Sequence, residues 1–341
     1  MLKRLLSVLL LIAPAALSAA PTQIKLATLA PENSSWMKEM RAGSKEIFER
    51  TDGRVQLKFY GGGVMGNDKK VLRKMRIGQL HGGSFTPSGL SERCPDFGIY
   101  GQVLTFDSLA EAAYVRERMD SQVMEKLDQA GLVGFGIAGG GFALIMSQQP
   151  VTEYADLKGR KMWVPEGDLM TFSAMKSLDL SPVVLPLTDV LTGLQTGLID
   201  IIGTPPVGAI ALQWYTKVNY VTDFPIVYAY ASLVVEKSIM DRLSAEDQTV
   251  VREVMDEIYR RFDGASLAEN ASAREAMIGN GIKFVEPKTG AIDTWRERVV
   301  TTNQALVDQG LLSRDLYDEL QGHISDYRAA ETAQASTAGT D

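Results

Sequence analysis

Residues 24–85 alternate short apolar runs with amphipathic segments, and this alternation constrains the fold more than any other feature of the chain. The runs at 24–29, 55–60 and 80–85 have the composition of buried strands. The segments between them carry apolar residues at helical spacing, and Asn67 is placed to cap the second helix. Short joins between strand and helix predict a parallel sheet with right-handed crossovers.

The same alternation returns in residues 161–215, which predicts a second lobe of similar architecture. The longest helical pattern of the chain follows later, at 244–278. We therefore predict an α/β fold of two lobes, each a mostly parallel sheet flanked by helices, joined by hinge strands and a long connecting helix. The predicted division gives lobe 1 residues 21–143 and 234–282, and lobe 2 residues 144–233 and 283–329.

The two termini differ in composition from the rest of the chain. Residues 1–20 have a basic start, an almost unbroken apolar run and small residues at the end, which is the layout of a secretory signal peptide. The apolar run is too short to span a bilayer comfortably. We therefore predict an exported protein whose signal peptide is cleaved close to residue 20. The last segment, 330–341, is small and polar, which predicts a disordered tail.

Charge and the reactive side chains exclude several classes of function. The 341-residue chain has a net charge of −7, and removal of residues 1–20, which hold two basic and no acidic residues, brings it to −9. An acidic chain without basic clusters is a poor match for nucleic acid or for an anionic membrane surface. Cys94 is the single cysteine, so no intrachain disulfide can form, and with only His81 and His323 there is no zinc spacing.

Cofactor and catalytic motifs give no support to an enzyme. The glycine-rich segment 134–139 has the spacing G-x-G-x-x-G of a dinucleotide site. Such a site needs the glycines to open a helix, whereas these run into an apolar strand, so we interpret them as a crossing between the lobes. No nucleophile has a visible base beside it. We predict no catalytic residue, no metal and no cofactor.

The strand ends in segments 156–168 and 190–206 are the best candidates for a ligand site. In open α/β sheets, ligands bind in the crevice beyond the carboxyl ends of the strands. Trp163 is either part of the core or a platform in this crevice. Glu166 and Asp168 suit an acid–base pair or a cation site, and Asp168 suits equally well the cap of the helix that follows.

Six stretches of the chain carry a family signature. They read KLATLAPENSSW, RTDGRVQLKFY, GGGVMGNDKKVLRKMRIGQL, DLKGRKMWVP, VLPLTDVLTGLQTGLID and KSIMDRLSAEDQTVV. In this order they resemble the DctP family, the substrate-binding proteins of tripartite ATP-independent periplasmic (TRAP) transporters. The resemblance implies a two-lobed periplasmic receptor that closes on a small solute and delivers it to an ion-gradient-driven permease of one small and one large membrane subunit.

The chain departs from that family at the positions that bind the ligand. The resemblance places Trp163 where the family has an arginine that grips a carboxylate, and Ala143 where a second arginine is common. Thr204 stands where the family has an amide contact. Strand alternation gives Arg160 no clear place in the cleft. These departures predict a ligand that is not a carboxylate, but an aromatic, neutral or cationic solute.

We predict a site of aromatic rings, carboxylates and small polar residues. The predicted residues are Trp163, Glu166, Asp168, Thr204, Tyr60, Phe85, Ala143, Trp214, Tyr215 and His81. A single histidine is more often structural than ligand-binding, although its titration range keeps His81 among the candidates. Two alternatives stay open: an exported enzyme that uses paired carboxylates, and a receptor for a membrane sensor kinase. We expect a monomer.

Overall fold

The structure is a computed structural model that describes residues 21–338, so the predicted signal peptide lies outside the described residues. Its strands are β1 (Thr22–Ala27), β2 (Val55–Tyr60), β3 (Gly82–Phe85), β4 (Leu132–Gly134), β5 (Ala138–Ser147), β6 (Met162–Pro165), β7 (Pro182–Leu185), β8 (Ile201–Thr204), β9 (Tyr220–Glu236) and β10 (Lys283–Val285).

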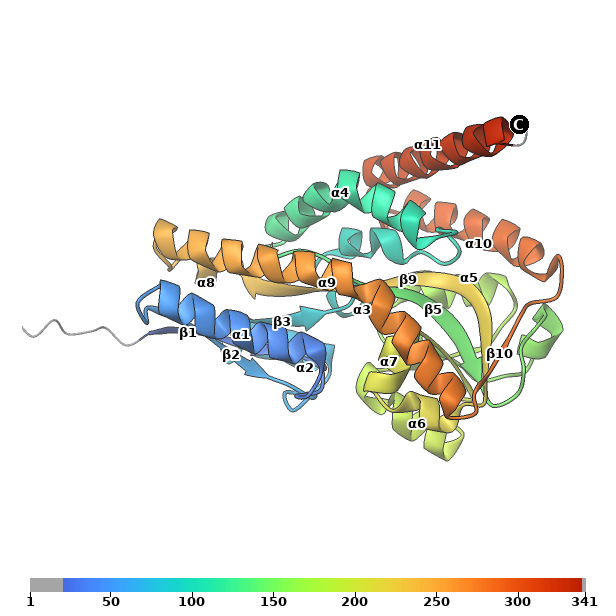
Figure 1. Cartoon of the computed structure of the whole chain (residues 1–341), viewed down its shortest axis with the longest axis horizontal. Coiled ribbons are helices and arrows are strands. Elements are labelled where there is room, and N and C mark those ends of the chain that lie inside the picture. The colour runs from blue at the N-terminus through green and yellow to red at the C-terminus, as the bar shows by residue number, and fades with distance from the viewer. Residues whose placement is uncertain (1–20, 339–341) are drawn as a thin grey trace, which may run out of the picture.

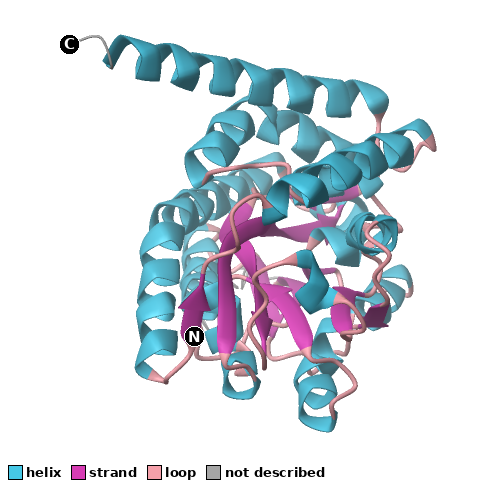
Figure 2. Cartoon of the chain, turned by 90° about the vertical axis from the view of Figure 1, so that its right-hand side faces the viewer, coloured by secondary structure: helices cyan, strands magenta, loops and turns pink. Residues whose placement is uncertain are grey.

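The helices surround these strands (Figure 2). They are α1 (Ser35–Arg50), α2 (Asp68–Arg76), α3 (Pro87–Leu90), α4 (Leu109–Gln129), α5 (Leu169–Ser177), α6 (Val190–Thr196), α7 (Pro206–Ala211), α8 (Lys237–Met240), α9 (Ala245–Gly279), α10 (Ala291–Asp308) and α11 (Arg314–Ala338). Short 3-10 helices are η1 (Pro95–Gly101), η2 (Tyr154–Leu157), η3 (Leu187–Asp189) and η4 (Trp214–Lys217). Within 21–338, none of these helices is both long and apolar enough to cross a bilayer.

The strands follow the order β2-β1-β3-β9-β5-β8-β6-β7, with β4 and β10 pairing separately with β9. The outer strands of each lobe are parallel, as predicted, because helices connect them. The central pairings of β9 with β3 and β5 are antiparallel. At the first of these, Gly82 lies so close to β9 that a side chain would overlap the carbonyl oxygen of Val234. The predicted α/β fold class is confirmed, with a mixed rather than purely parallel centre.

Strands β5 and β9 pass from one lobe to the other. The last residues of β9 pair with β3 and β4, whereas its earlier residues pair with β5 and β10. The register between β5 and β9 shifts at Gly139–Gly141, inside the glycine segment that the sequence indicates as a crossing. No helix begins at these glycines, so they do not form a dinucleotide fingerprint.

Helix α9 runs along both lobes (Figure 1) and belongs to the core of each. Ile258 in its middle packs with Ile24 of β1 and the inner face of α1. Met277 near its end packs with Trp163 in the second lobe. Full burial of side chains of this size contributes roughly 1.5–3 kcal/mol each. The predicted division assigned this helix wholly to lobe 1, whereas the structure gives it a share in both.

The C-terminal segment also differs from the prediction. Helix α11 packs on α4 and continues to Ala338, so residues 330–338 are helical where the sequence predicted a disordered tail. The physical reason is the alanine content of this stretch, because alanine has the highest intrinsic helix propensity. The remaining tail residues, 339–341, lie outside the described chain.

Candidate functional site: a cavity between the lobes

A cavity of about 550 Å³ lies where the two lobes meet. Its walls come from the segment 86–101 of the first lobe, from the strand ends of β6 and β8 in the second, and from β5 and β9. The turn between α10 and α11 closes the remaining side through Leu311 and Leu312. This volume falls within the range of about 300–1,000 Å³ that is usual for small-molecule sites. Both predicted strand ends reach the cavity.

Trp163 is both core and cavity wall, which resolves the two interpretations of the sequence. Its side chain is 5% exposed, and its ring stands edge-on to Trp214 with 5.3 Å between ring centroids. The indole Nε1 donates a hydrogen bond to the carbonyl oxygen of Leu185 at 2.9 Å. The polar atom of Trp163 is thus engaged inside its own lobe. The apolar ring surface of Trp163 lines the cavity, and the ring of Trp214 lies beside it.

Asp168 caps α5 and also lines the cavity. Its Oδ1 accepts a hydrogen bond from the backbone N–H of Thr171 at 2.9 Å, which confirms the predicted cap. Burial raises the pKa of the Asp168 carboxyl above its ordinary value, because a charge is poorly solvated there. Among the cavity-lining residues of the described chain, the ionisable acids are Asp168 and Glu92, and none is Lys, Arg or His.

Glu166 is not among the residues that line the cavity, and it lines the adjacent hollow at the outer edge of the lobes instead. Its carboxylate lies 3.1 Å from Nζ of Lys69 and accepts a bond from Nδ2 of Asn67 at 3.4 Å. Burial, together with the charge of Glu166, raises the pKa of the neighbouring Asp68 to about 6. Gly167 turns the chain between the two carboxylates, so one faces the outer edge and the other the cavity.

Ala143 of β5 and Thr204 of β8 lie on paired strands, and both line the cavity. Leu144 of β5 is in register with Thr204 of β8. Both predicted residues are small, so the wall at this place is recessed rather than closed by a long side chain. They occupy the positions at which the resemblance expected an arginine and an amide.

Four predicted residues are not brought to the cavity. Phe85 is 1% exposed in the core of the first lobe, and Tyr60 packs against the same core, with Nζ of Lys58 5.4 Å from its ring centroid. Nδ1 of His81 accepts a hydrogen bond from the backbone N–H of Lys25, and burial lowers the pKa of this imidazole. Tyr215 packs behind Trp214 in the second lobe. Phe85 and Tyr60 stand at strand ends and Tyr215 stands in η4, but none of the four side chains lines the cavity.

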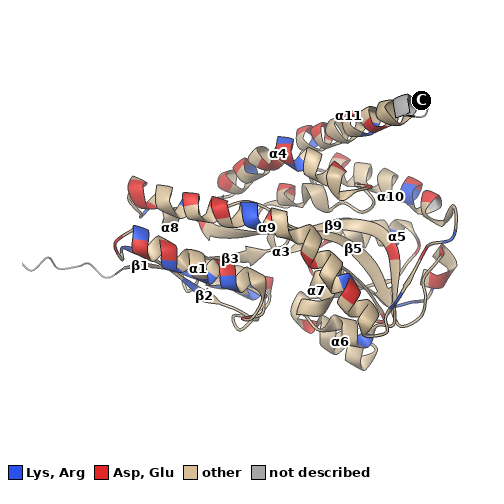
Figure 3. Ribbon diagram, viewed as in Figure 1, with Lys and Arg blue, Asp and Glu red and all other residues tan. Residues whose placement is uncertain are grey.

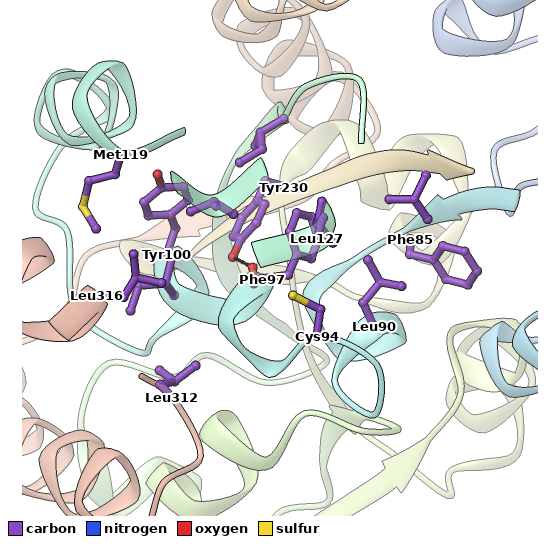
Figure 4. Packing of buried hydrophobic residues seen from close by; sticks show 14 of the residues in the cluster. Phe85, Leu90, Cys94, Phe97, Tyr100, Met119, Leu127, Tyr230, Leu312 and Leu316 are labelled. Atoms are coloured by element: carbon purple, nitrogen blue, oxygen red, sulfur yellow. Dashed lines mark hydrogen bonds between the residues drawn. The ribbon is translucent and has the colours of Figure 1, made fainter. Parts of the chain in front are cut away.

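Tyr228 and Tyr230 line the cavity and were missed by the sequence reasoning. They are two residues apart on β9, so they share a face, and their rings stack with 5.9 Å between centroids. The hydroxyl of Tyr230 donates to the carbonyl oxygen of Phe97 (Figure 4). The signal was present in the alternation of the apolar stretch 225–235, but the pattern does not say which face meets the cleft.

A buried arginine stands behind Tyr228 without reaching the cavity wall. Nη1 of Arg116 donates to the Tyr228 hydroxyl at 3.1 Å and to Oδ1 of Asp263 at 2.9 Å. Nη2 donates to Asp120 and to the carbonyl oxygen of Ile137, both at 2.8 Å. Both terminal nitrogens of this guanidinium are therefore committed to protein partners on α4, α9, β9 and the segment that enters β5.

The basic residues near the motif are also committed elsewhere. Nε of Arg160 lies 3.1 Å from the carboxylate of Asp200, and Nζ of Lys161 donates to the carbonyl oxygen of Gly197. Figure 3 shows the central parts of β5 and β9 in the colour of uncharged residues. Among residues 21–338, no group of three or more His, Cys, Asp or Glu side chains is placed to hold a metal ion. The cavity is apolar with an acidic edge.

The comparison with known proteins gives the family. Residues 26–309 match the model of the family described as bacterial extracellular solute-binding protein, family 7, named DctP. The chain belongs to this family. A solute-binding protein of Roseobacter denitrificans is 25% identical over 297 residues, covering 86% of this chain and 90% of the relative.

Two further relatives extend the comparison. The C4-dicarboxylate-binding periplasmic protein DctP of Rhodobacter capsulatus is 24% identical over 273 residues, covering 78% of this chain and 80% of that protein. A TRAP periplasmic solute-binding protein of Xanthobacter autotrophicus, solved with bound β-D-galacturonate, superposes with a TM-score of 0.80 at 22% identity, covering 89% and 99% of the two chains. This last likeness shows the two-lobed fold. Members of the DctP family are periplasmic solute receptors rather than enzymes, and they work with TRAP membrane permeases.

Proposed function

We propose that this DctP-family protein is an extracytoplasmic receptor that encloses a small organic solute between its lobes and delivers it to the two membrane subunits of a TRAP permease. The cavity carries this proposal, because it lies between the lobes and has the size of a small-molecule site. The export signal expected at residues 1–20 supports a periplasmic location. Closure on a ligand is a hinge motion driven by contacts that exist only in the closed state.

We further propose that the solute is not a carboxylate. Two of the similar proteins are named for or solved with carboxylates, namely C4-dicarboxylates and β-D-galacturonate. In this chain the described cavity wall carries Glu92 and Asp168 but no Lys, Arg or His. A carboxylate buried there without a cation partner would lose about 2–5 kcal/mol, which corresponds to a loss of affinity from roughly thirtyfold to several thousandfold.

The wall favours an aromatic, neutral or amine-bearing solute. Trp163, Trp214 and Tyr228 present apolar and aromatic surface. Asp168 supplies a carboxyl that can accept a hydrogen bond from a hydroxyl or an ammonium group, and aromatic rings beside a carboxylate suit a cation. A bound cation would also draw the raised pKa of Asp168 back down, so binding of an amine would release a proton as pH approaches that pKa.

A thermal-shift screen tests the ligand class. The purified protein is heated with organic acids, amines, polyols and aromatic solutes, and the melting temperature is recorded. We expect aromatic, neutral or amine solutes to raise the melting temperature by a few degrees, and simple carboxylates to leave it unchanged. A carboxylate that stabilises the wild-type protein as strongly would contradict the proposed ligand class while leaving the receptor role intact.

The variants Trp163→Arg and Ala143→Arg sharpen the same screen. Each returns a cation to a position that lines the cavity, so each should gain carboxylate binding that the wild type lacks. Ala143→Arg is the safer of the two, because Trp163 also fills the core and donates to Leu185. Tyr215→Arg is the control, since Tyr215 lies behind Trp214 and outside the cavity wall.

A further inference from the structure

The cavity has two ends of different chemistry. One end borders the hollow at the outer edge of the lobes, and the lining residues that the two share are Ser88, Ser91, Glu92, Gly167 and Leu187. The other end borders a surface hollow at the α10–α11 turn, and there the shared residues are Pro95, Leu311 and Leu312. The edge hollow and the turn hollow have no lining residue in common. The cavity therefore extends from an acidic edge to an apolar turn.

At the apolar end, two glycines in the cavity wall leave open space. A Cβ atom added to Gly98 would meet no atom within 4 Å, and for one added to Gly101 the nearest atoms would be those of Pro87 and Tyr230 at 3.8 Å. Neither glycine has a positive φ, so no turn requires the absence of a side chain. Gly98 thus leaves space along η1 that a larger group could occupy.

Several polar groups around this end bond to partners within the protein, although the buried Tyr100 hydroxyl and Oε1 of Gln102 do not. The Tyr230 hydroxyl donates to Phe97, and Nε2 of Gln102 donates to the carbonyl oxygen of Ile99. Asp96 accepts from the backbone N–H of Ser313 at 2.7 Å, and Nζ of Lys126 lies 3.4 Å from the same carboxylate. A solute group placed here would contact mainly carbon atoms and would have few hydrogen-bond partners.

The same contacts make the apolar end preformed. Asp96 ties the start of η1 to Ser313 at the start of α11, which holds the α10–α11 turn against the cavity. Leu312 is buried in the core of the first lobe, and Figure 4 shows it on the same side of that core as Leu316. A preformed apolar wall lowers the entropy cost of binding, because fewer side chains must be ordered.

We propose that Pro95, Gly98, Gly101, Leu311 and Leu312 form an apolar tail subsite, which takes an alkyl or alicyclic group of a solute whose polar head lies toward Asp168. This inference rests on the proposed function, and it makes the solute amphipathic rather than a compact polar molecule. Each methylene placed in the subsite should raise affinity about fourfold until the space is filled.

Two homologous series test the subsite by isothermal titration calorimetry with the full mature chain. One series runs from phenol to 4-hexylphenol and the other from propylamine to octylamine, so that both head groups of the proposed class are represented. We expect one molecule bound per chain and an affinity that rises about fourfold per methylene over the first few members. The gain should stop once the tail fills the end of the cavity.

Gly98→Leu should abolish this rise. Its side chain would occupy the open space at Gly98, so long-tailed members should bind no better than the short ones, while the shortest members change less than twofold. The control is Gly322→Leu, at an exposed helical glycine with open space and no positive φ, which should leave both series unchanged. Leu311→Ser, which leaves a smaller and more polar wall, serves as a second variant should Gly98→Leu fold poorly.

The outcomes separate the two proposals. If short phenols or amines bind and affinity does not rise with tail length, the tail subsite is overturned and the receptor proposal stands. If neither series binds but a short carboxylate does, the proposed ligand class fails and the subsite with it. The subsite would also be overturned if affinity stopped rising with tail length in both Gly98→Leu and Gly322→Leu, because the effect would then not depend on the subsite wall.

Discussion

Two of the regions in which the lobes meet are built in opposite ways. At the crossing of β5 and β9, Arg116 has a side chain that is 9% exposed and bonds to Asp120, Tyr228 and Asp263. At the outer edge, Lys69 meets Glu166 at 3.1 Å with side chains that are 55% and 31% exposed. A charge network removed from water is costly to break, whereas an exposed ion pair contributes about 0–1 kcal/mol.

The difference indicates where the molecule can move. A hinge motion needs one contact that persists in both states and another that forms only on closure. The crossing has the buried, many-partner contacts of the first kind. The edge has the screened, few-partner contacts of the second kind, and it stands next to the cavity. We therefore expect the lobes to separate at the edge, while the contacts at the crossing persist in both states.

Arg116→Met tests the crossing and should have the largest effect. It removes the cation between Asp120 and Asp263 and leaves the Tyr228 hydroxyl without its donor, so we expect a loss of about 3 kcal/mol in the free energy of unfolding. Urea denaturation measures it. The control Arg260→Met removes an exposed partner of Asp256 and should cost less than about 0.5 kcal/mol. Equal losses in both would show that the crossing is no stronger than the surface.

Gly167→Ala tests the edge as a contact of the closed state. A Cβ there would lie 2.5 Å from the carbonyl oxygen of Ser88, so the lobes could not approach as they do now. Gly159 is the matched control, because it also has a positive φ but nothing within 4 Å. Both variants should lose about 1 kcal/mol of stability from backbone strain. Only Gly167→Ala should also weaken binding, by about tenfold, of the best solute from the thermal-shift screen. Equal affinities in the two variants would refute a closing role for the edge.

The pH dependence of stability that comes from Asp68, at the edge, should be the smallest effect. The folded pKa of Asp68 is raised to about 6, first by burial and then by Glu166, so its ionised form opposes folding above that pH. Stability should therefore rise as pH falls from 7 to 5, by about 1 kcal/mol relative to Asp68→Asn, because the folded state takes up the proton that the unfolded state binds only near pH 4. Urea denaturation at both pH values measures this. Parallel pH profiles for the two proteins would contradict it.

Local features of the chain were predictable where the interactions are local. Asn67 and Asp168 cap helices as the sequence indicates, because a cap needs only residues three positions apart. The glycines at 134–139 lie at a crossing and not at a helix start. The family signature was likewise readable, and it is confirmed by the match over residues 26–309.

The cavity wall was predicted only in part. Its wall includes Trp163, Asp168, Ala143, Thr204 and Trp214, whereas Glu166, two residues from Asp168, lines the neighbouring hollow. Phe85 points into the core, while the next residue, Thr86, lines the cavity. A strand end locates a site to within a few residues, but one residue of shift reverses the direction of a side chain.

The sequence by itself determined the α/β alternation, the helix caps and the family, because each depends on neighbours along the chain or on motifs in order. Only the tertiary structure decided that Tyr228 and Tyr230 face the cleft, that Glu166 turns outward to Lys69, and that Leu311 closes the far end. These outcomes depend on how the lobes are placed on each other. That placement is set by pairings between distant segments, such as β5 with β9 and Arg116 with Asp263, which leave no periodic signal in the chain.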